Sequence, residues 1–210
     1  ARLIADLLKT AGADRIVSVD LHTDQIQGFF DGPVDHMRAQ PLLCGYLADN
    51  YGGHDLVVVS PDSGRVRVAE KWADALGGVP LAFIHKTRDP LVPNQVKSNR
   101  VVGDVRGKTC ILTDDMIDTG GTIAGAVKLL HQDGAKDVII AATHGVLSEP
   151  ASQRLADCGA REVIVTNTLP IGADKQFEQL TVLSIAPLLA STIRAVFDNG
   201  SVTELFDGSA

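Results

Sequence analysis

The sequence is short of cysteine, of basic residues and of long apolar runs, and each shortage excludes a class of protein. Its three cysteines, Cys44, Cys110 and Cys158, have a spacing that fits neither a disulfide framework nor a zinc site. The 19 Lys and Arg residues are outnumbered by 26 Asp and Glu, which gives a net charge of −7 and disfavours a nucleic-acid surface. No apolar run reaches the roughly 18 residues of a membrane span, and no signal-like segment opens the sequence. We therefore expect a cytoplasmic protein that has neither nucleic acid nor a membrane as a partner.

Short apolar runs recur along the 210 residues, of which 45% are hydrophobic. The runs are nearly all apolar instead of alternating with polar residues, which is typical of strands covered on both faces. Helical patterns that end in glycine lie between several of them, at 67–78 and 122–134. Strands and helices in alternation predict an α/β fold with a parallel sheet flanked by helices. Cys110 falls in one of the strands, where we expect a small buried thiol. The expected strands are 15–20, 56–61, 81–85, 109–115, 137–144 and 162–168.

Polar residues gather at the carboxyl ends of the expected strands. In parallel sheets, ligands bind where these ends open into a crevice. The sequence therefore predicts a binding site along this edge. The polar groups that follow a strand are Asp20–His22, Ser60–Asp62, His85–Lys86, Asp114–Asp115 and Thr143–His144.

The stretch TDDMIDTGGTI at 113–123 combines an acidic pair with a glycine turn that opens a helix. Free backbone N–H groups and the positive end of the helix dipole converge there, so Thr119–Thr122 predicts a seat for a phosphate. Asp114 and Asp115 point to opposite sides of an extended backbone, and a carboxylate facing the crevice can accept hydrogen bonds from vicinal sugar hydroxyls. A plain Asp-Gly turn with a capped helix explains the glycine turn equally well, but it explains the acidic pair poorly. The combination favours a sugar phosphate.

The long stretch ILTDDMIDTGGTI resembles the phosphoribosyl-diphosphate signature of the type I phosphoribosyltransferase fold. The segments DLHTDQIQGFFDGPVDH at 20–36, VVVSPDSGRVRVAEKWADAL, FIHKTR and THGVLS are similar, in the same order, to ribose-phosphate pyrophosphokinases. The resemblance covers essentially the whole sequence. It implies a type I phosphoribosyltransferase-like fold and an enzyme of nucleotide biosynthesis. Such an enzyme transfers the diphosphate of ATP to the anomeric hydroxyl of ribose 5-phosphate, giving phosphoribosyl diphosphate and AMP.

The same resemblance implies roles for individual residues. Lys86 and Arg88 would be catalytic, stabilising the charge that develops during transfer. They lie at the base of 86–107, which has no strong helix or strand pattern and is a candidate mobile loop. Mg²⁺ would be held near His22 and Asp62, although imidazole is an unusual Mg²⁺ ligand and His22 can instead contact phosphate. The weaker metal candidates are Asp20, Asp31 and Asp35. The ribose 5-phosphate site would consist of Arg88, Asp114, Asp115, Asp118, Thr119, Gly120, Gly121 and Thr122.

Two positions are left without a role. The family commonly has a glycine where this sequence has Arg65, and a guanidinium beside the diphosphate loop would either add a bidentate cation or crowd the site. His144 closes a strand, and lining the crevice is no more probable for it than a purely structural role.

The resemblance also implies how the chain is organised. Residues 1–38 would be the remnant of a first phosphoribosyltransferase-like domain, and 39–183 a second one that carries the ribose 5-phosphate site. Residues 184–210 would form a C-terminal helix and tail that pack back on the first domain. In the family, an upstream half absent from this sequence supplies most ATP contacts, and the subunits assemble as hexamers, so a homo-oligomer is expected.

Two other functions remain open from the sequence. One is a phosphoribosyltransferase that consumes phosphoribosyl diphosphate, which would share the glycine-turn signature but not the segment at 20–36. The other is an inactive truncated or regulatory homologue that keeps the fold. If most of the first half is absent, this piece alone is expected to bind ribose 5-phosphate and to turn over poorly.

Overall fold

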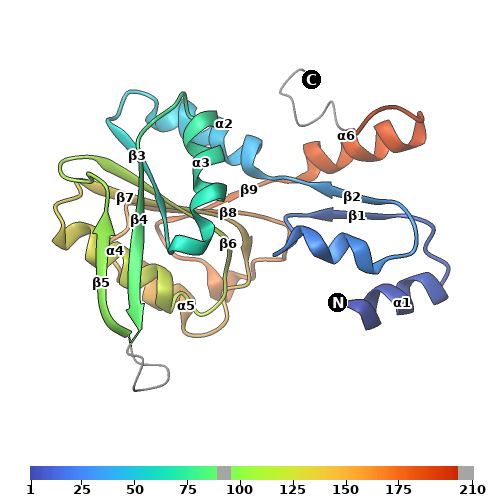
Figure 1. Ribbon diagram of the computed structural model, residues 1–210, viewed down its shortest axis with the longest axis horizontal. Helices are drawn as coiled ribbons and strands as arrows, with labels where there is room; N and C mark the ends of the chain where they lie inside the picture. The colour runs from blue at the N-terminus through green and yellow to red at the C-terminus, as the bar shows by residue number, and fades with distance from the viewer. Residues whose placement is uncertain (89–95, 203–210) are drawn as a thin grey trace. The chain divides into compact units, whose positions relative to one another are not determined.

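The chain consists of two compact units, Leu42–Leu183 and a smaller one that combines Ala1–Pro41 with Ser184–Ala210. The computed structural model describes the backbone of residues 1–88 and 96–202, and the side chains of the same ranges without 86–88 and 96–98. Each unit has its own sheet (Figure 1). None of the helices in these ranges is long and apolar enough to cross a membrane.

The larger unit is built on a sheet whose described strands lie in the order β5-β4-β3-β6-β7-β8-β9. Neighbouring strands run parallel, with the exception of the antiparallel pair β4 and β5. The expected α/β class is therefore confirmed. The strands are β3 (Leu56–Ser60), β4 (Leu81–Arg88), β5 (Val96–Val102), β6 (Thr109–Ile117), β7 (Asp137–Gly145), β8 (Glu162–Thr166) and β9 (Leu180–Leu183).

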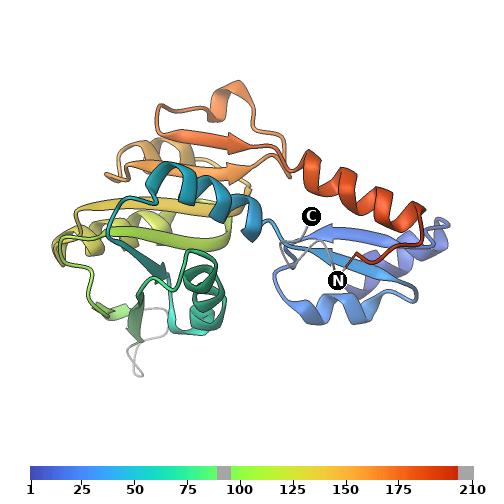
Figure 2. The same cartoon turned by 90° about the horizontal axis from the view of Figure 1, so that it is seen from above.

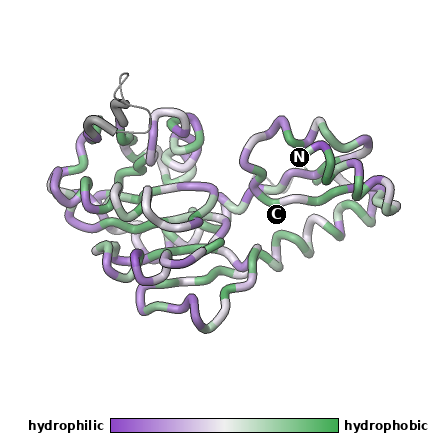
Figure 3. The backbone as a smooth tube through the Cα atoms, turned by 90° about the horizontal axis from the view of Figure 1, so that it is seen from below, coloured by the Kyte–Doolittle hydropathy of each residue, from purple (hydrophilic) through white to green (hydrophobic). Residues whose placement is uncertain are grey.

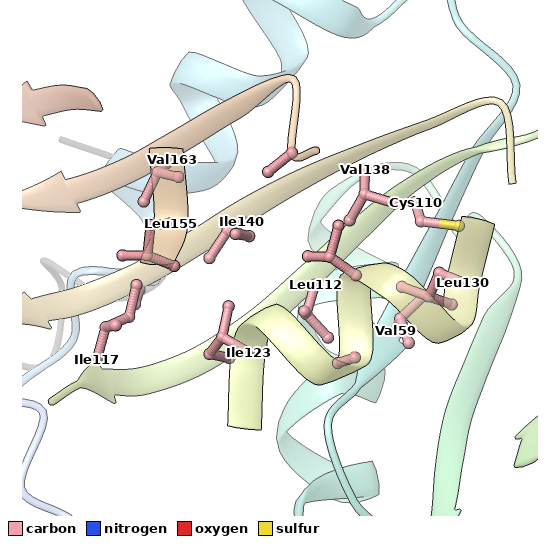
Figure 4. Close-up of a cluster of buried hydrophobic side chains, with 14 of the residues drawn as sticks. Val59, Cys110, Leu112, Ile117, Ile123, Leu130, Val138, Ile140, Leu155 and Val163 are labelled. Atoms are coloured by element: carbon pink, nitrogen blue, oxygen red, sulfur yellow. The ribbon is translucent and has the colours of Figure 1, made fainter. Parts of the chain in front are cut away.

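Helices cover both faces of this sheet, which explains why its strands are apolar throughout. Helices α2 (Gln40–Tyr51) and α3 (Val66–Ala75) lie on one face, and α4 (Gly121–Gln132) and α5 (Ala151–Ala156) on the other (Figures 1 and 2). Alternate residues of each strand, such as Leu112 on β6, join the core beneath α4 and α5 (Figure 4). Cys110 is fully buried in this core, as expected.

The expectation of one long loop at 86–107 is wrong. Strand β4 continues to Arg88, and β5 follows it as an antiparallel edge strand. The sequence VKSNRVV of β5 mixes polar and apolar residues, because an edge strand is less enclosed than a central one, and Asn99 and Arg100 are exposed. That mixture hid the strand from a search for apolar runs. Residues 89–95 lie outside the described part of the chain.

The smaller unit contains a parallel pair of strands, β1 (Ile16–Val19) and β2 (Val34–Met37). The 3₁₀ turn η1 (Asp24–Phe29) connects them, and helices α1 (Arg2–Thr10) and α6 (Ala186–Phe197) complete the unit. Apolar residues recur along α6, as the hydropathy colours of Figure 3 show. Several apolar side chains of α1 and α6 are exposed. They are Leu3, Ile4, Leu7, Leu8, Ile193 and Phe197.

A carboxylate at the amino-terminal edge of the larger sheet ties α2 to the strands. The Glu162 side chain accepts hydrogen bonds from the hydroxyl groups of Tyr46, at 2.7 Å, and of Tyr51 and Thr181. Burial, and then the bond to Glu162, raise the pKa of Tyr51 well above its usual range, so its hydroxyl remains a donor. Bonds from neutral donors to a charged acceptor are among the stronger ones in proteins.

Replacing Tyr51 with Phe removes one of these donors and keeps the ring. We expect Tyr51→Phe to lower the free energy of unfolding by about 1–3 kcal/mol, because a part-buried carboxylate loses a hydrogen bond. Urea denaturation followed by circular dichroism measures the change. Asn50→Ala is the matched control, since Asn50 bonds only at the exposed surface of the same helix. A Tyr51→Phe midpoint equal to that of the unsubstituted protein would contradict a stabilising role for the bond.

Candidate functional site

The candidate site lies at the carboxyl ends of β3 and β6, where the order of the sheet reverses. The chain leaves β3 for β4 on one side, whereas β6 leads to β7 on the other. Connections that diverge in this way leave an opening between them, and ligands of α/β sheets bind at such switch points. The polar loop after β3 and the glycine turn after β6 flank this opening.

The acidic pair occupies the last part of β6. Asp114 is paired in register with Ala142 of β7, and the backbone N–H of Asp115 donates to Oδ1 of Asp114 at 2.9 Å. Both side chains are partly shielded from solvent. Two carboxylates are therefore held next to each other at the end of a buried strand.

The environment of Asp114 opposes its ionisation. Burial, followed by the neighbouring Asp115 carboxyl, raises the pKa of Asp114 to about 7. The N–H of Asp115 and the positive charge of Arg65 act in the opposite direction. Near neutral pH the Asp114 carboxyl is close to the midpoint of its titration, which is a setting often found at functional sites.

The glycine turn places a helix N-terminus beside this pair. Gly120 has the left-handed φ of 69°, and as the N-cap of α4, which begins at Gly121, it has no side chain that could cap the first amides. A Cβ on Gly120 would also come within 3.4 Å of Leu155, so glycine suits both the backbone and the packing. Asp118, Thr119, Gly121 and Thr122 are exposed around the turn, as a phosphate seat requires.

A residue from α5 braces the glycine turn. Arg154 donates a hydrogen bond from Nη1 to the backbone oxygen of Thr119. A Cβ added to Gly121 would lie 3.4 Å from the same nitrogen. The guanidinium therefore adds positive charge at the turn and restrains its backbone. No local sequence pattern predicts this contact, because Arg154 lies on another element.

The loop after β3 is organised by Asp62. Its Oδ1 accepts hydrogen bonds from the backbone N–H groups of Gly64 at 2.8 Å and Arg65 at 3.1 Å, and its backbone oxygen accepts one from Ser60 Oγ at 2.7 Å. Asp62 thus caps the 3₁₀ turn η2 (Ser63–Arg65) that leads into α3. Its carboxylate keeps capacity for a further partner, since an ionised carboxylate can accept about four hydrogen bonds.

Arg65 joins the two loops. Its Nη2 lies 2.9 Å from Oδ2 of Asp115, and the two side chains are only 21% and 10% exposed. The sequence singled out Arg65 as a departure from the family but could not place its partner. The structure brings it to the acidic pair.

The smaller unit holds all the remaining metal candidates, and two of its aspartates make contacts within that unit. Asp20 accepts from the N–H of Ala39 at 2.9 Å, and Asp35 pairs with Arg15. Asp31 and His22 are exposed. These contacts account for the acidic groups at 20 and 35 without a metal.

His36, which the sequence did not single out, supports the loop that carries His22. Its Nε2 accepts the N–H of Leu21 at 2.7 Å. Burial, and then the charge of Arg38, lower the pKa of His36, which favours the neutral ring that this acceptor role needs. Its signal was its place in the segment DLHTDQIQGFFDGPVDH.

The side chains that the structure describes do not by themselves form a magnesium cage. Within the described ranges no group of three or more His, Cys, Asp or Glu residues could hold a metal ion. Mg²⁺ commonly keeps waters and binds through one or two carboxylates together with substrate phosphates. The residues present fit that mode, with Asp62 as an oxygen ligand, and do not form a cage.

Three further residues that the sequence raised remain to be located. The side chains of Lys86 and Arg88 lie outside the part of the chain that the structure describes. His144 bonds through Nδ1 to Thr168 Oγ1 at 2.8 Å, on the strand beside β6 and opposite Met116. This bond gives His144 a structural partner next to the crevice.

The sequence was compared with known families and proteins. Residues 82–207 match the model of the family described as the phosphoribosyl synthetase-associated domain. The chain is 86% identical over all its residues to a protein of Mycobacterium tuberculosis named ribose-phosphate pyrophosphokinase, and 80% identical to one of the same name from Mycobacterium leprae. It spans 64% of the length of each.

A solved structure gives the same picture. The crystal structure of phosphoribosylpyrophosphate synthetase from Mycobacterium smegmatis matches with a TM-score of 0.89 and 83% identity. The match covers 95% of this chain and 64% of that one. It agrees with the α/β, type I phosphoribosyltransferase-like fold expected from the motif.

The raised pKa of Asp114 predicts a pH-dependent cost to folding. The carboxyl ionises near 3.8 when unfolded and near 7 when folded, so its contribution to stability falls as pH rises between these values and is constant above them. Asp114→Asn removes this loss. We expect its melting temperature, relative to the unsubstituted protein, to increase by several degrees from pH 4.5 to pH 8.

Thermal melts of ligand-free protein at several pH values measure this difference. Asp133→Asn is the control, because Asp133 is an exposed carboxylate at the other end of α4. A melting difference between Asp114→Asn and the unsubstituted protein that is the same at every pH would contradict the raised pKa.

Proposed function

Because the chain belongs to the phosphoribosyl synthetase-associated domain family, we propose that it carries the ribose 5-phosphate site of a ribose-phosphate diphosphokinase. The reaction transfers the diphosphate of ATP to ribose 5-phosphate and supplies phosphoribosyl diphosphate for nucleotide biosynthesis. The observation that carries this proposal is the meeting of an acidic pair, an uncapped helix N-terminus and the Asp62 loop at one switch point of the sheet. The names of the relatives support it.

The phosphate of ribose 5-phosphate suits the turn after β6, and its sugar suits the acidic pair at the end of β6. The amides at the start of α4 and the hydroxyls of Thr119 and Thr122 donate to the 5-phosphate, and Asp118 completes the turn. Asp114 and Asp115 accept hydrogen bonds from the ring hydroxyls. Both oxygens of a carboxyl group act purely as acceptors only when the group is ionised. The proximity of the turn and the acidic pair on one strand–turn–helix element fixes the sugar relative to its phosphate.

In the transfer step, the anomeric oxygen of the sugar forms a bond to the β-phosphorus of ATP. The bond from that phosphorus to the bridging oxygen of the α-phosphate breaks, AMP leaves with that oxygen, and the sugar hydroxyl loses its proton. We assign Lys86 and Arg88 the task of stabilising the negative charge that grows on the phosphoryl oxygens. Arg88 is also assigned to ribose 5-phosphate.

Mg²⁺ belongs to this proposal as the ion that neutralises phosphate charge. Asp62 would supply an oxygen ligand, His22 is the second candidate, and Asp20, Asp31 and Asp35 are weaker candidates. Most ATP contacts are assigned to residues beyond the 64% of the relatives that this chain spans. A homo-oligomer, a hexamer as in the family, and a cytoplasmic location complete the proposal.

Lys86→Ala separates the proposed catalytic role from binding. In the natural polypeptide, the formation of AMP from ATP and ribose 5-phosphate with Mg²⁺ is expected to fall about a hundredfold in kcat. The dissociation constant of ribose 5-phosphate, measured by calorimetry, should change less than about threefold, because the charge develops only in the transition state.

Lys136→Ala is the matched control, since Lys136 is an exposed lysine just before β7, at the opposite edge of the sheet. Unchanged kcat in Lys86→Ala would exclude that lysine from catalysis. Absence of AMP formation by the unsubstituted polypeptide would refute the diphosphokinase assignment, and a product formed only when a nucleobase replaces ATP as co-substrate would point to a transferase.

A further inference from the structure

The ion pair between Arg65 and Asp115 links two loops that belong to separate sequence motifs of the family. Arg65 belongs to the loop after β3, and Asp115 to the acidic pair of β6. Strands β3 and β6 are parallel neighbours, with Val59 opposite Leu112, so both loops leave the sheet at the same edge. The pair at 2.9 Å therefore spans the switch point.

We propose that Arg65 is a positioning residue for the sugar, holding the Asp115 carboxylate in the orientation in which it accepts the ribose hydroxyls. The inference rests on the ribose 5-phosphate site proposed above and extends it to a residue outside the signature. Because Arg65 belongs to the Asp62 loop, a ligand bound at that loop would also affect the geometry of the acidic pair.

The guanidinium projects from a backbone that is itself fixed. The N–H groups of Gly64 and Arg65 are both held by Oδ1 of Asp62, and Arg65 is followed directly by α3. The Cα of Arg65 is therefore held in place relative to the sheet, and its planar guanidinium is pre-organised for contact with a carboxylate. With the two side chains only 21% and 10% exposed, the contact is less screened than a surface pair.

The position of Arg65 also counters the repulsion between two adjacent carboxylates. Asp114 and Asp115 are adjacent carboxylates, and hydroxyl groups are best accepted by carboxylates that are ionised. Burial and the neighbouring Asp115 raise the pKa of Asp114, and Arg65 opposes the rise. Among the other titratable groups nearby, His144 lies on β7 opposite Met116, and Asp118 follows in the exposed turn. Arg65 is thus a cation that favours the accepting form of the pair.

A sugar role and a diphosphate role for Arg65 give different kinetics. If the guanidinium mainly bound the diphosphate of ATP, its loss would raise KM for ATP. If it orients Asp115, its loss raises KM for ribose 5-phosphate and moves the ionisation of the acidic pair to higher pH. The contact seen with Asp115 favours the second role.

The test compares Arg65→Gln and Arg65→Lys with the unsubstituted natural polypeptide in AMP formation from pH 6 to pH 9. Arg65→Gln should raise KM for ribose 5-phosphate about tenfold, the loss expected for a charge-assisted contact. KM for ATP should change less than about twofold, because the contact is to a sugar ligand. The acid limb of kcat/KM for ribose 5-phosphate should move up by about one pH unit, since removing a nearby cation raises carboxyl pKa values. Arg65→Lys should restore the acid limb by its charge and the KM only in part, because it lacks the planar fork.

Arg161→Gln is the matched control. Arg161 pairs with Asp137 at 3.1 Å on the opposite edge of the sheet, so the same substitution breaks a comparable arginine–aspartate pair away from the site. Both KM values and the pH profile should remain as in the unsubstituted polypeptide.

The possible outcomes distinguish a failure of the positioning role of Arg65 from a failure of the proposed function. Turnover by the unsubstituted polypeptide together with an unchanged KM and acid limb in Arg65→Gln overturns the positioning role and leaves the proposed function standing. A rise confined to KM for ATP overturns it in favour of a diphosphate contact. If the unsubstituted polypeptide forms no AMP, the proposed function falls, and the role of Arg65 with it. Should Arg65→Gln fail to fold by circular dichroism, the partial loss in Arg65→Lys carries the test.

Discussion

The parallel pairing of β6 between β3 and β7 is the constraint on which the binding edge of the larger unit depends. It buries the strand from Thr109 to Thr113, so the carboxylates that follow emerge at a fixed height above the core. It also places the loop after β3 next to the glycine turn. The chain leaves β3 for β4 on one side of this strand pair and leaves β6 for β7 on the other side. The helix dipole of α4, the Asp62 cap and the acidic pair meet as a consequence of strand order.

The charges at this edge work against folding, as expected where acidic groups are kept for a purpose other than stability. A carboxyl whose pKa is raised to about 7 by burial is kept at the end of β6, where a neutral side chain would cost less. The other edge shows the opposite arrangement. There Glu162 has three hydroxyl donors from α2 and β9, and its contacts serve to hold the layers together. The contrast between a satisfied carboxylate and an opposed pair distinguishes a structural cluster from a candidate site.

Much of the fold was readable from the sequence, because strands buried on both faces leave continuous apolar runs and helices leave a period and a glycine stop. The acidic pair and the glycine turn were readable for a similar reason, since their partners are a few residues apart. Strand β5 was missed because an edge strand carries polar residues, and the partners of Arg65 and Arg154 could not be predicted because they are distant in sequence. A side chain that reaches across loops has no local pattern. Its partner depends on the order of the strands in the sheet. The sequence predicted the class of fold but not that order.

The net charge of −7 does not prevent an anion from binding at this edge. Charges more than about 8–10 Å apart are largely screened at physiological ionic strength, so the field at the glycine turn is set by what lies within a few ångströms of it. There the uncapped amides of α4 and the guanidinium of Arg154 supply positive character. Close to the turn, the charge of Asp115 in the acidic pair is countered by Arg65, whose Nη2 lies 2.9 Å from Oδ2 of Asp115. A net negative charge is therefore compatible with a local site for an anion, provided that positive groups lie close to that site.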